Sequence, residues 1–279
     1  MRERAYAKIN LCLDVLGKRE DGYHELKMVM VPIDFYDVLE LLPSEETTIQ
    51  LNRSYLPVNE KNTVIKAINV MKEEYDIQEN FACTLVKHIP SQAGLAGGSA
   101  DAAAAIRIMN CLCHLNLSEE ELIEVGKKVG ADVPFCLLNT PALVEGIGEK
   151  ITPFKVNTDF ELLLVKPRRG ISTAVAFKEL NFDTIVHPDC EKMKTSLETD
   201  DYEGVIASLG NSLEEVSLRF VEEIKEIKED LQSFGFDGVL MSGSGSTVFG
   251  ITRNKKLVEK VSGIMRAKGY FARSAKILK

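Results

Sequence analysis

The sequence predicts an α+β protein built from two domains. Three observations support this: residues 5–51 are strand-like, residues 62–130 combine helical apolar spacing with a glycine-rich turn, and the composition shifts between residues 157 and 160. A chain of 279 residues, 45% of them hydrophobic and 27% charged, is long enough for two cores. We place the domains at residues 1–157 and 158–279.

Residues 5–51 predict the strands of one sheet. Stretches at 5–15, 34–42 and 47–51 are extended-looking and partly alternate apolar with polar residues. Turns are expected at 21–22 and at 43–44, where Gly, Pro, Asp and Ser gather. The beginning of the chain is therefore expected to be rich in sheet.

Helices follow this sheet. Apolar residues recur at helical spacing over residues 62–75, where Asn62 is placed to cap the first turn. Residues 81–88 then alternate like a strand and lead into the glycine-rich turn. Another helix is expected to begin after Ser118, because Glu121 stands at the capping-box position.

The second half of the chain mixes strands and helices. We expect, in chain order, strands near 142–145, 149–152 and 161–165, a helix capped by Ser172, helices over 201–209 and 216–234, a strand–turn–strand over 238–250, a helix over 255–268 and a strand over 270–275. Glu and Lys residues at helical spacing in 216–234 indicate a solvated face.

Charge and cysteine content exclude several classes of protein. A net charge of −8 argues against a partner such as nucleic acid or a membrane surface, because both attract positive proteins. No run approaches the ~20 apolar residues of a membrane span, and the N-terminus lacks the apolar core of a signal peptide. The six cysteines form no Cys-x-x-Cys pair, so we expect reduced core thiols in a cytoplasmic protein.

The stretch from Pro90 to Ala105 is a glycine-rich turn that leads into an alanine-rich helix. Glycines at 94, 97 and 98 permit positive φ and let an anion approach the backbone, whose N–H groups are unpaired at the start of the helix. No Gly-Lys-Ser/Thr and no Gly-x-Gly-x-x-Gly is present. The stretch predicts a phosphate-binding loop; an ordinary loop before a buried helix is the alternative.

Four other regions contain residues that a scaffold does not require. Lys8 and Asn10 share one side of an apolar strand, either as functional groups or with Lys8 protecting a sheet edge. The turn at 21–25 is a candidate site or a plain surface turn. Asp132 is a candidate catalytic carboxylate or a helix cap. The Gly-Ser-Gly turn at 243–245 binds a ligand or forms only a tight hairpin.

Zinc and hydrolase sites are not predicted. The four histidines are scattered, and none has a second His or a Cys at ligand spacing. No Gly-x-Ser-x-Gly sequence is present, and the Gly-Ser-rich turn near the end lacks the strand-to-helix context of a nucleophile elbow.

Taken together, several short stretches resemble the galactokinase, homoserine kinase, mevalonate kinase and phosphomevalonate kinase superfamily. They lie at residues 7–11, 19–25, 94–99, 130–135, 166–173 and 241–245. Asp21-Gly22-Tyr23-His24 and Gly130–Phe135 are similar to those kinases of the superfamily that phosphorylate the 2-hydroxyl of a cytidine-diphosphate-linked methylerythritol in the non-mevalonate isoprenoid pathway. The resemblance implies an N-terminal ribosomal-protein-S5-domain-2-like domain, a C-terminal ferredoxin-like α/β domain and an active site in the cleft between them.

The resemblance also implies roles in phosphoryl transfer from ATP. Asp132 would accept or orient the proton of the acceptor hydroxyl, with Lys8 beside both. The residues implied to bind ATP are Pro90, Gly94, Leu95, Ala96, Gly97, Gly98, Ser99, Asn62 and Lys87. Mg²⁺ is implied as cofactor, but its ligands are left open, because Ala100 stands where relatives carry a second Ser or Thr. Gln92 replaces a glycine of some relatives.

The acceptor would be held by a second set of residues. Tyr23 and Phe177 resemble the aromatic pair that holds a cytosine ring, and His24 the group that hydrogen-bonds its edge. Asn10 and Thr173 would contact the methylerythritol or its diphosphate. Three residues would close the diphosphate side of the site, namely Gly243, Ser244 and Gly245. Ala174 replaces a proline that is frequent in relatives.

Two alternatives stay open. A kinase of the same superfamily for another small alcohol, such as homoserine or mevalonate, would have no base to stack on the aromatic pair. A nucleotide-binding sensor that has lost catalysis would not need both Lys8 and Asp132. The oligomeric state is left open between a monomer and a weak homodimer.

Overall fold

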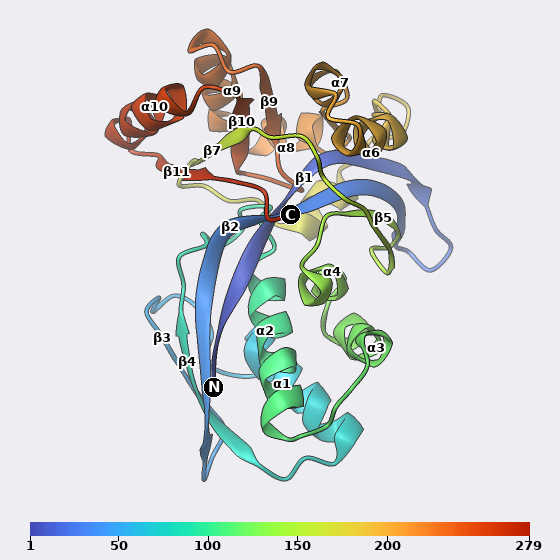
Figure 1. The fold of residues 1–279 in the computed structure, drawn as a ribbon, viewed down its shortest axis with the longest axis vertical. Helices are drawn as coiled ribbons and strands as arrows, with labels where there is room; N and C mark the ends of the chain where they lie inside the picture. The colour runs from blue at the N-terminus through green and yellow to red at the C-terminus, as the bar shows by residue number, and fades with distance from the viewer. The chain divides into compact units, whose positions relative to one another are not determined.

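The computed structural model describes all residues from Met1 to Lys279 and shows a mixed α+β fold (Figure 1). Two long strands, β1 (Arg2–Lys18) and β2 (His24–Ser44), contribute residues to both of its compact units. Unit 1 consists of Met1–Ala7, Phe35–Ser91 and Ala96–Asn139, and unit 2 of Lys8–Asp34, Gln92–Leu95 and Thr140–Lys279. The domain boundary at residues 157 and 158 stays a prediction.

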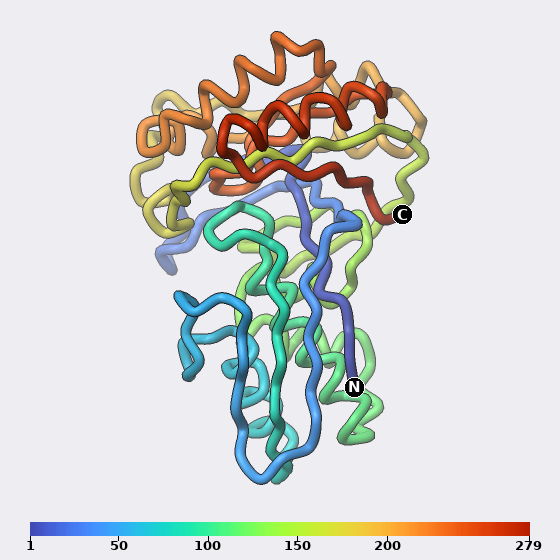
Figure 2. The backbone as a smooth tube through the Cα atoms, turned by 90° about the vertical axis from the view of Figure 1, so that its left-hand side faces the viewer, coloured from blue at the N-terminus to red at the C-terminus, as the bar shows by residue number.

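Unit 1 joins strands to a pair of helices. Strand β4 (Asn80–Val86) is antiparallel to β2, with Leu41 opposite Cys83, and parallel to β3 (Thr48–Leu51). Figures 1 and 2 show α1 (Thr63–Tyr75) and α2 (Gly97–Leu112) packed together on one face of these strands. The alanine run of α2 is buried, which lets the helix approach its neighbours closely.

Helix caps in unit 1 follow the sequence. The Asn62 side chain accepts a hydrogen bond from the N–H of Val64 and caps α1. Ser118 and Glu121 form both hydrogen bonds of a capping box at the start of α3 (Glu119–Val129). Both caps are confirmed. Helix α4 (Val133–Leu138) was considered only through the alternative that Asp132 caps a helix, because six residues are too few for a helical period to show.

The second half of the chain, within unit 2, contains a four-stranded antiparallel sheet in the order β11-β7-β10-β9. Its strands are β7 (Glu161–Lys166), β9 (Gly238–Met241), β10 (Val248–Thr252) and β11 (Phe271–Ala275). Two helices, α9 (Glu223–Ser233) and α10 (Lys255–Ala267), pack on the same face of this sheet (Figures 1 and 2). This strand order and the helices that connect the strands are those of a ferredoxin-like domain, as predicted.

Smaller elements complete unit 2. Strand β5 (Ala142–Gly146) pairs antiparallel with β2 and with β6 (Lys150–Pro153), and the two-residue β8 (Gly210–Asn211) runs parallel to β1. The remaining helices are α5 (Thr173–Lys178), α6 (Cys190–Glu198), α7 (Tyr202–Ala207) and α8 (Glu214–Phe220).

The single helix expected over residues 216–234 is wrong. Helix α8 ends at Phe220, and Val221 adopts φ −135° and ψ 88°, which is extended backbone. The Val221 carbonyl then accepts the N–H of Ile224 in the first turn of α9. Val221 is itself buried, so the apolar spacing runs on through the break and does not reveal it.

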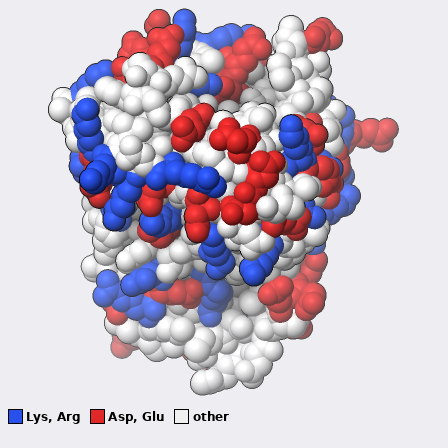
Figure 3. All heavy atoms as spheres, turned by 45° about the horizontal axis from the view of Figure 1, so that its top comes forward, with Lys and Arg blue, Asp and Glu red and all other residues white.

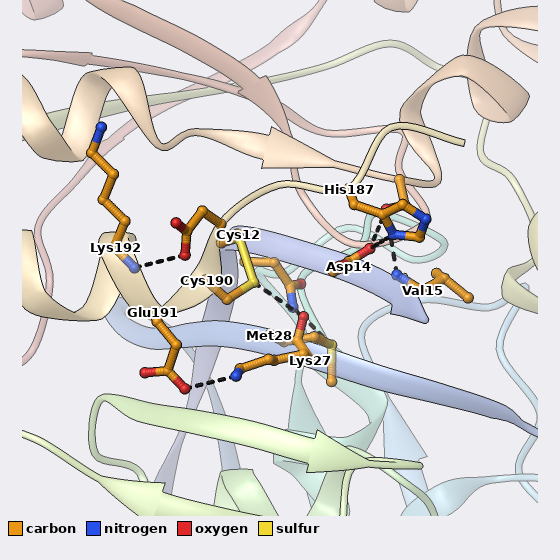
Figure 4. Close-up of a disulfide and its surroundings, with 12 residues drawn as sticks. Cys12, Asp14, Val15, Lys27, Met28, His187, Cys190, Glu191 and Lys192 are labelled. Carbon is orange, nitrogen blue, oxygen red and sulfur yellow. Dashed lines mark hydrogen bonds and ion pairs between the residues drawn. A yellow bond between two sulfur atoms is a disulfide. The ribbon is translucent and has the colours of Figure 1, made fainter. Parts of the chain in front are cut away.

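The expectation that all six cysteines are thiols is also wrong. The structure joins Cys12 in β1 to Cys190, the first residue of α6, in a disulfide whose Cα atoms lie 5.6 Å apart (Figure 4). The ion pair between Lys27 and Glu191 lies beside it. Because the two cysteines are 178 positions apart in the sequence, no local spacing could indicate the pair.

The surface carries both signs of charge. On the face drawn in Figure 3, Lys and Arg side chains are interspersed with Asp and Glu side chains, and neither sign covers the face alone. Each helix is too short or too polar to span a lipid bilayer.

Candidate active site

The glycine-rich loop joins β4 to α2 through an unusual backbone. Three of its residues have positive φ: Gln92 (48°), Gly94 (72°) and Ala96 (54°). Ala96 occupies the N-cap position of α2 and makes no side-chain hydrogen bond to the first turn. The N–H groups at the start of α2 therefore have no side-chain cap, at the positive end of the helix dipole.

Gly94 packs directly on the Gly/Ser turn between β9 and β10. A Cβ atom on Gly94 would lie 1.9 Å from the carbonyl oxygen of Ser242, so only glycine fits. The Ser242 hydroxyl donates to the Gly94 carbonyl at 3.0 Å, and the N–H of Thr247 donates to the Ala93 carbonyl at 3.2 Å. The first half of the loop and the turn near the C-terminus thus form one structure in unit 2.

Strand β1 joins the same structure. The N–H of Lys8 donates to the Leu95 carbonyl at 3.2 Å, and the N–H of Asn10 donates to the Ser242 hydroxyl at 3.3 Å. The Lys8 ammonium donates to the Asn10 side-chain oxygen at 2.7 Å. Lys8 is only 5% exposed, which excludes the alternative of a solvated charge protecting a sheet edge.

Asp132 lies at the N-cap position of α4 but makes no side-chain capping hydrogen bond, so the alternative that it merely caps a helix is not supported. Its side chain is half-buried. The helix that follows is fixed to α2, because the Arg107 guanidinium donates to the carbonyl of Cys136 at 2.7 Å. Asp132 therefore stands at the start of an anchored helix in unit 1.

An aromatic cluster forms at the start of β2. The His24 ring stacks on Phe177 with ring centroids 5.0 Å apart and on Phe182 at 5.9 Å. Tyr23, next to it, is 59% exposed. Burial, and next the charge of Lys18, lowers the pKa of His24, which keeps its imidazole neutral near pH 7. Phe182 was missed, because it lies outside every motif.

The Gly/Ser turn also contacts α5. The Thr173 and Ser244 hydroxyls are 2.9 Å apart, and Asn211 donates to the Gly243 carbonyl at 2.8 Å. Gly243 and Gly245 have φ of 56° and 84°, where a side chain would be strained. Thr173 itself is exposed. The turn thus places Ser244 beside Thr173.

Two residues expected to bind ATP have structural partners in unit 1. Asn62, besides capping α1, donates to the Pro57 carbonyl at 2.8 Å. The Lys87 ammonium is buried between the carboxylates of Asp37 and Asp101. Asp37 was missed, although it is in phase with the buried Phe35 and Leu39, so the alternation of β2 places a carboxylate on the inward side of the strand.

The carboxylates around Lys87 are electrostatically coupled. Burial raises the pKa of Asp101 to about 7, against the attraction of Lys87 and with a further rise from Asp37. Burial alone would lower the pKa of Lys87, but the two carboxylates raise it above its ordinary value. The ammonium is therefore charged at neutral pH.

Comparisons with known proteins identify the family. Models described as "GHMP kinases N terminal domain" and "GHMP kinases C terminal" match residues 62–140 and 193–270. A 4-diphosphocytidyl-2-C-methyl-D-erythritol kinase of a Geobacillus species is 43% identical over 265 residues, covering 94% of this chain and 92% of the relative. The chain belongs to this kinase family. A member from Clostridium beijerinckii is 45% identical over 253 residues, covering 90% of each chain.

Solved structures agree with membership of the 4-diphosphocytidyl-2-C-methyl-D-erythritol kinase family. A crystal structure titled 4-(cytidine 5'-diphospho)-2C-methyl-D-erythritol kinase superposes with a TM-score of 0.84 at 29% identity, over the full length of both chains. A homoserine kinase from Cytophaga hutchinsonii shares the fold, with a TM-score of 0.74 at 17% identity, over 98% of this chain and 94% of that one. The two-domain kinase fold is confirmed, and the chain is an ATP-dependent phosphotransferase with an alcohol as acceptor.

Proposed function

We propose that this chain transfers the γ-phosphoryl group of ATP to the 2-hydroxyl of 4-diphosphocytidyl-2-C-methyl-D-erythritol, in the non-mevalonate pathway to isoprenoid precursors. One observation carries the proposal beyond family membership. The Ser242 hydroxyl accepts from the backbone of Asn10 and donates to the backbone of Gly94, so the three segments that resemble kinase motifs meet at one atom.

The donor phosphates would bind to the backbone of the glycine-rich loop and the start of α2. This assignment includes Pro90, Gly94, Leu95, Ala96, Gly97, Gly98 and Ser99, with Asn62 and Lys87 behind them. Mg²⁺ keeps several waters and binds mainly phosphate oxygens, so it needs few protein ligands. No group of three or more His, Cys, Asp or Glu side chains could hold a metal by itself, which suits an ion carried by ATP. The Ser99 hydroxyl would contact a phosphate or this ion.

Lys8 and Asp132 would carry the transfer. The bond between the γ-phosphorus and the bridging oxygen breaks to release ADP, while the acceptor oxygen bonds to phosphorus and gives its proton to Asp132. Lys8 stabilises the negative charge on the transferring group. Burial strengthens this effect, because little water screens its ammonium. Most of the rate enhancement comes from such positioning and charge stabilisation.

The acceptor base would stack on the aromatic cluster of Tyr23, Phe177 and Phe182. Stacking tolerates any base, so selectivity for cytosine falls to His24, whose neutral ring offers one donor and one acceptor. Asn10 and Thr173 would contact the methylerythritol or its diphosphate, and residues 243–245 would close that side. Ala174, in place of proline, leaves the first turn of α5 with one more N–H donor.

A coupled ADP-release assay over a panel of acceptors tests the function. We expect activity with the cytidylylated methylerythritol and none with mevalonate or homoserine. Preference for mevalonate or homoserine would instead favour a kinase for another small alcohol. Nucleotide binding without activity on any acceptor would favour the alternative of a nucleotide-binding sensor that has lost catalysis.

We further propose a cytoplasmic enzyme that is a monomer or a weak homodimer. Sedimentation velocity over a concentration series measures the assembly. A stable higher oligomer would contradict this.

A further inference from the structure

The buried cluster of Asp37, Lys87 and Asp101 contains two carboxylates that the proposed chemistry does not use. Lys87 directly follows β4, Asp37 lies in β2 and Asp101 is the fifth residue of α2. The Lys87 ammonium lies 2.5 Å from an Asp101 carboxylate oxygen and is ion-paired with Asp37. All three side chains are buried. We call these three residues the lysine cluster.

The lysine cluster is a poor device for stability. Two carboxylates share one ammonium, and Asp101 Oδ1 is buried without a hydrogen-bond partner. Removing charges from water costs several kcal/mol per ion, and apolar replacements of buried ion pairs are often neutral or stabilising. An arrangement of this kind, retained beside the glycine-rich loop, points to a role other than holding the fold together.

The contacts of the lysine cluster lie at the two ends of the loop. On the side before Pro90, Asp37 Oδ1 accepts the N–H groups of His88, at 2.5 Å, and Ile89, at 2.8 Å. The backbone of Lys87 is held there too, because both its N–H and its carbonyl are hydrogen-bonded to the side chain of Asn52. The backbone of residues 87–89, which leads into the loop, is therefore fixed by hydrogen bonds to side chains.

On the side after the loop, the lysine cluster meets the start of α2. Asp101 lies one turn after Gly97, the first residue of this helix, and a Cβ atom on Gly97 would lie 3.2 Å from the Lys87 ammonium. The same atom would be 2.9 Å from a methyl group of Ile89. The first residue of α2 is thus seated on the segment that leads into the loop. One ammonium joins both ends through charge-assisted hydrogen bonds.

We propose that Asp37, Lys87 and Asp101 are positioning residues that set the separation of the two ends of the glycine-rich loop and so hold its N–H groups ready for the ATP phosphates. This inference rests on the proposed assignment of the loop to ATP. The three side chains act through the backbone, and the Lys87 charge is committed to the carboxylates. Backbone donors that are fixed before the ligand arrives bind more tightly, because less order is lost on binding.

Asp101→Asn is the first variant to test, because it removes the charge and keeps the size of the side chain. We expect the Michaelis constant for ATP to rise about tenfold, while kcat and the Michaelis constant of the acceptor stay within about twofold. Calorimetric titration of ADP without acceptor should show the same tenfold loss. Asp37→Asn should act in the same direction, and it serves as the second variant if Asp101→Asn does not fold.

Glu74→Gln is the matched control. Glu74 pairs with Lys128 at 2.5 Å in the same unit, away from the loop. This variant should leave ATP binding unchanged. The positioning role is wrong if ATP binding is unchanged in both Asp101→Asn and Asp37→Asn. It is also wrong if the Michaelis constant for the acceptor rises as much as the Michaelis constant for ATP.

Gly98→Ala separates this inference from the assignment of the loop. Gly98 is exposed in the first turn of α2, and its new Cβ would meet nothing nearer than 3.4 Å, so the fold tolerates the methyl group. If the methyl group leaves ATP binding intact, the loop is not the phosphate site. If Gly98→Ala weakens ATP binding and the Asp101 and Asp37 variants do not, only the positioning role fails.

Discussion

The glycine-rich loop and the aromatic cluster are held in place by different means. Gly94 packs against the Ser242 carbonyl oxygen, which leaves no room for a Cβ, and a buried ion pair of Lys87 lies beside the ends of the loop. His24 and Phe177, in contrast, are half-buried rings in contact with each other, and Tyr23 is mostly exposed. Phosphates need backbone donors at fixed spacing, whereas a flat base needs only a ring face. Changes at Gly94 should therefore affect folding and function together, and changes in the aromatic cluster should affect function alone.

The largest effect is expected at the point of transfer. Asp132→Ala should lower kcat by about 10²–10⁴-fold, the usual contribution of a positioned proton acceptor, with little change in ATP affinity. Single-turnover measurements with saturating ATP give the rate of the chemical step, and Asp132→Asn shows how much of it needs the charge. Activity within a few-fold of the parent would remove Asp132 from the mechanism.

Gly94→Ala should be next in size. The added Cβ would overlap the Ser242 carbonyl, and φ is positive, so we expect a loss of about 2–4 kcal/mol in the free energy of unfolding. Urea denaturation measures this. Gly263→Ala is the control, because Gly263 lies within α10 with nothing near its Cβ, and should gain about 1 kcal/mol. Equal stabilities for the two variants would contradict the close packing of the loop.

Tyr23→Ala and Phe177→Ala should each weaken binding of the cytidine substrate, by about 1–3 kcal/mol per lost stacking partner. The Michaelis constant of that substrate should rise while the midpoint of thermal unfolding stays nearly constant, since both rings are exposed in part. Tyr55→Ala, at another exposed tyrosine, is the control. A fall in stability without a change in the Michaelis constant would show that these rings stabilise the fold and do not bind the substrate.

A dependence of stability on pH is also expected. In the folded protein the pKa of Asp101 is about 7, against 3.8 ordinarily, so the folded state binds an extra proton between these values. The parent should therefore lose stability relative to Asp101→Asn as pH rises from about 4 to about 7, and the difference should stay constant above. Urea denaturation of both proteins at pH 5 and pH 8 measures it. Parallel curves would show that Asp101 is ionised throughout.

Local patterns in the sequence predicted much of the fold. Residues 5–15 lie within β1, and the caps at Asn62 and Ser118 follow from side chains only two or three residues from their partners. The break at Val221 was missed because a buried valine keeps the helical period through an extended residue. The spacing of apolar residues indicates which side of a segment is buried, but it does not indicate every place where the backbone changes direction.

The site was predictable where it consists of backbone and not where it consists of distant side-chain pairs. Glycine content identified the loop, and the Gly-Ser-Gly turn was found the same way. Asp37 could have been noticed, because it is a charged residue in phase with the apolar Phe35 and Leu39. Phe182 and the partner of Cys12 could not be found, because each acquires its role from a residue far away in the chain. Such pairings depend on the whole topology, and one sequence contains no direct sign of them.

The hydrogen bond from Ser242 to Gly94 has a consequence for synthesis of the chain on the ribosome. The two residues are 148 positions apart, so at about 5–20 residues per second the loop waits roughly 7–30 s for its partner to be made. During that time no Ser242 hydroxyl is present to hold the Gly94 carbonyl. A nascent chain stalled before residue 242 should therefore bind ATP weakly even though every residue of the loop has already emerged.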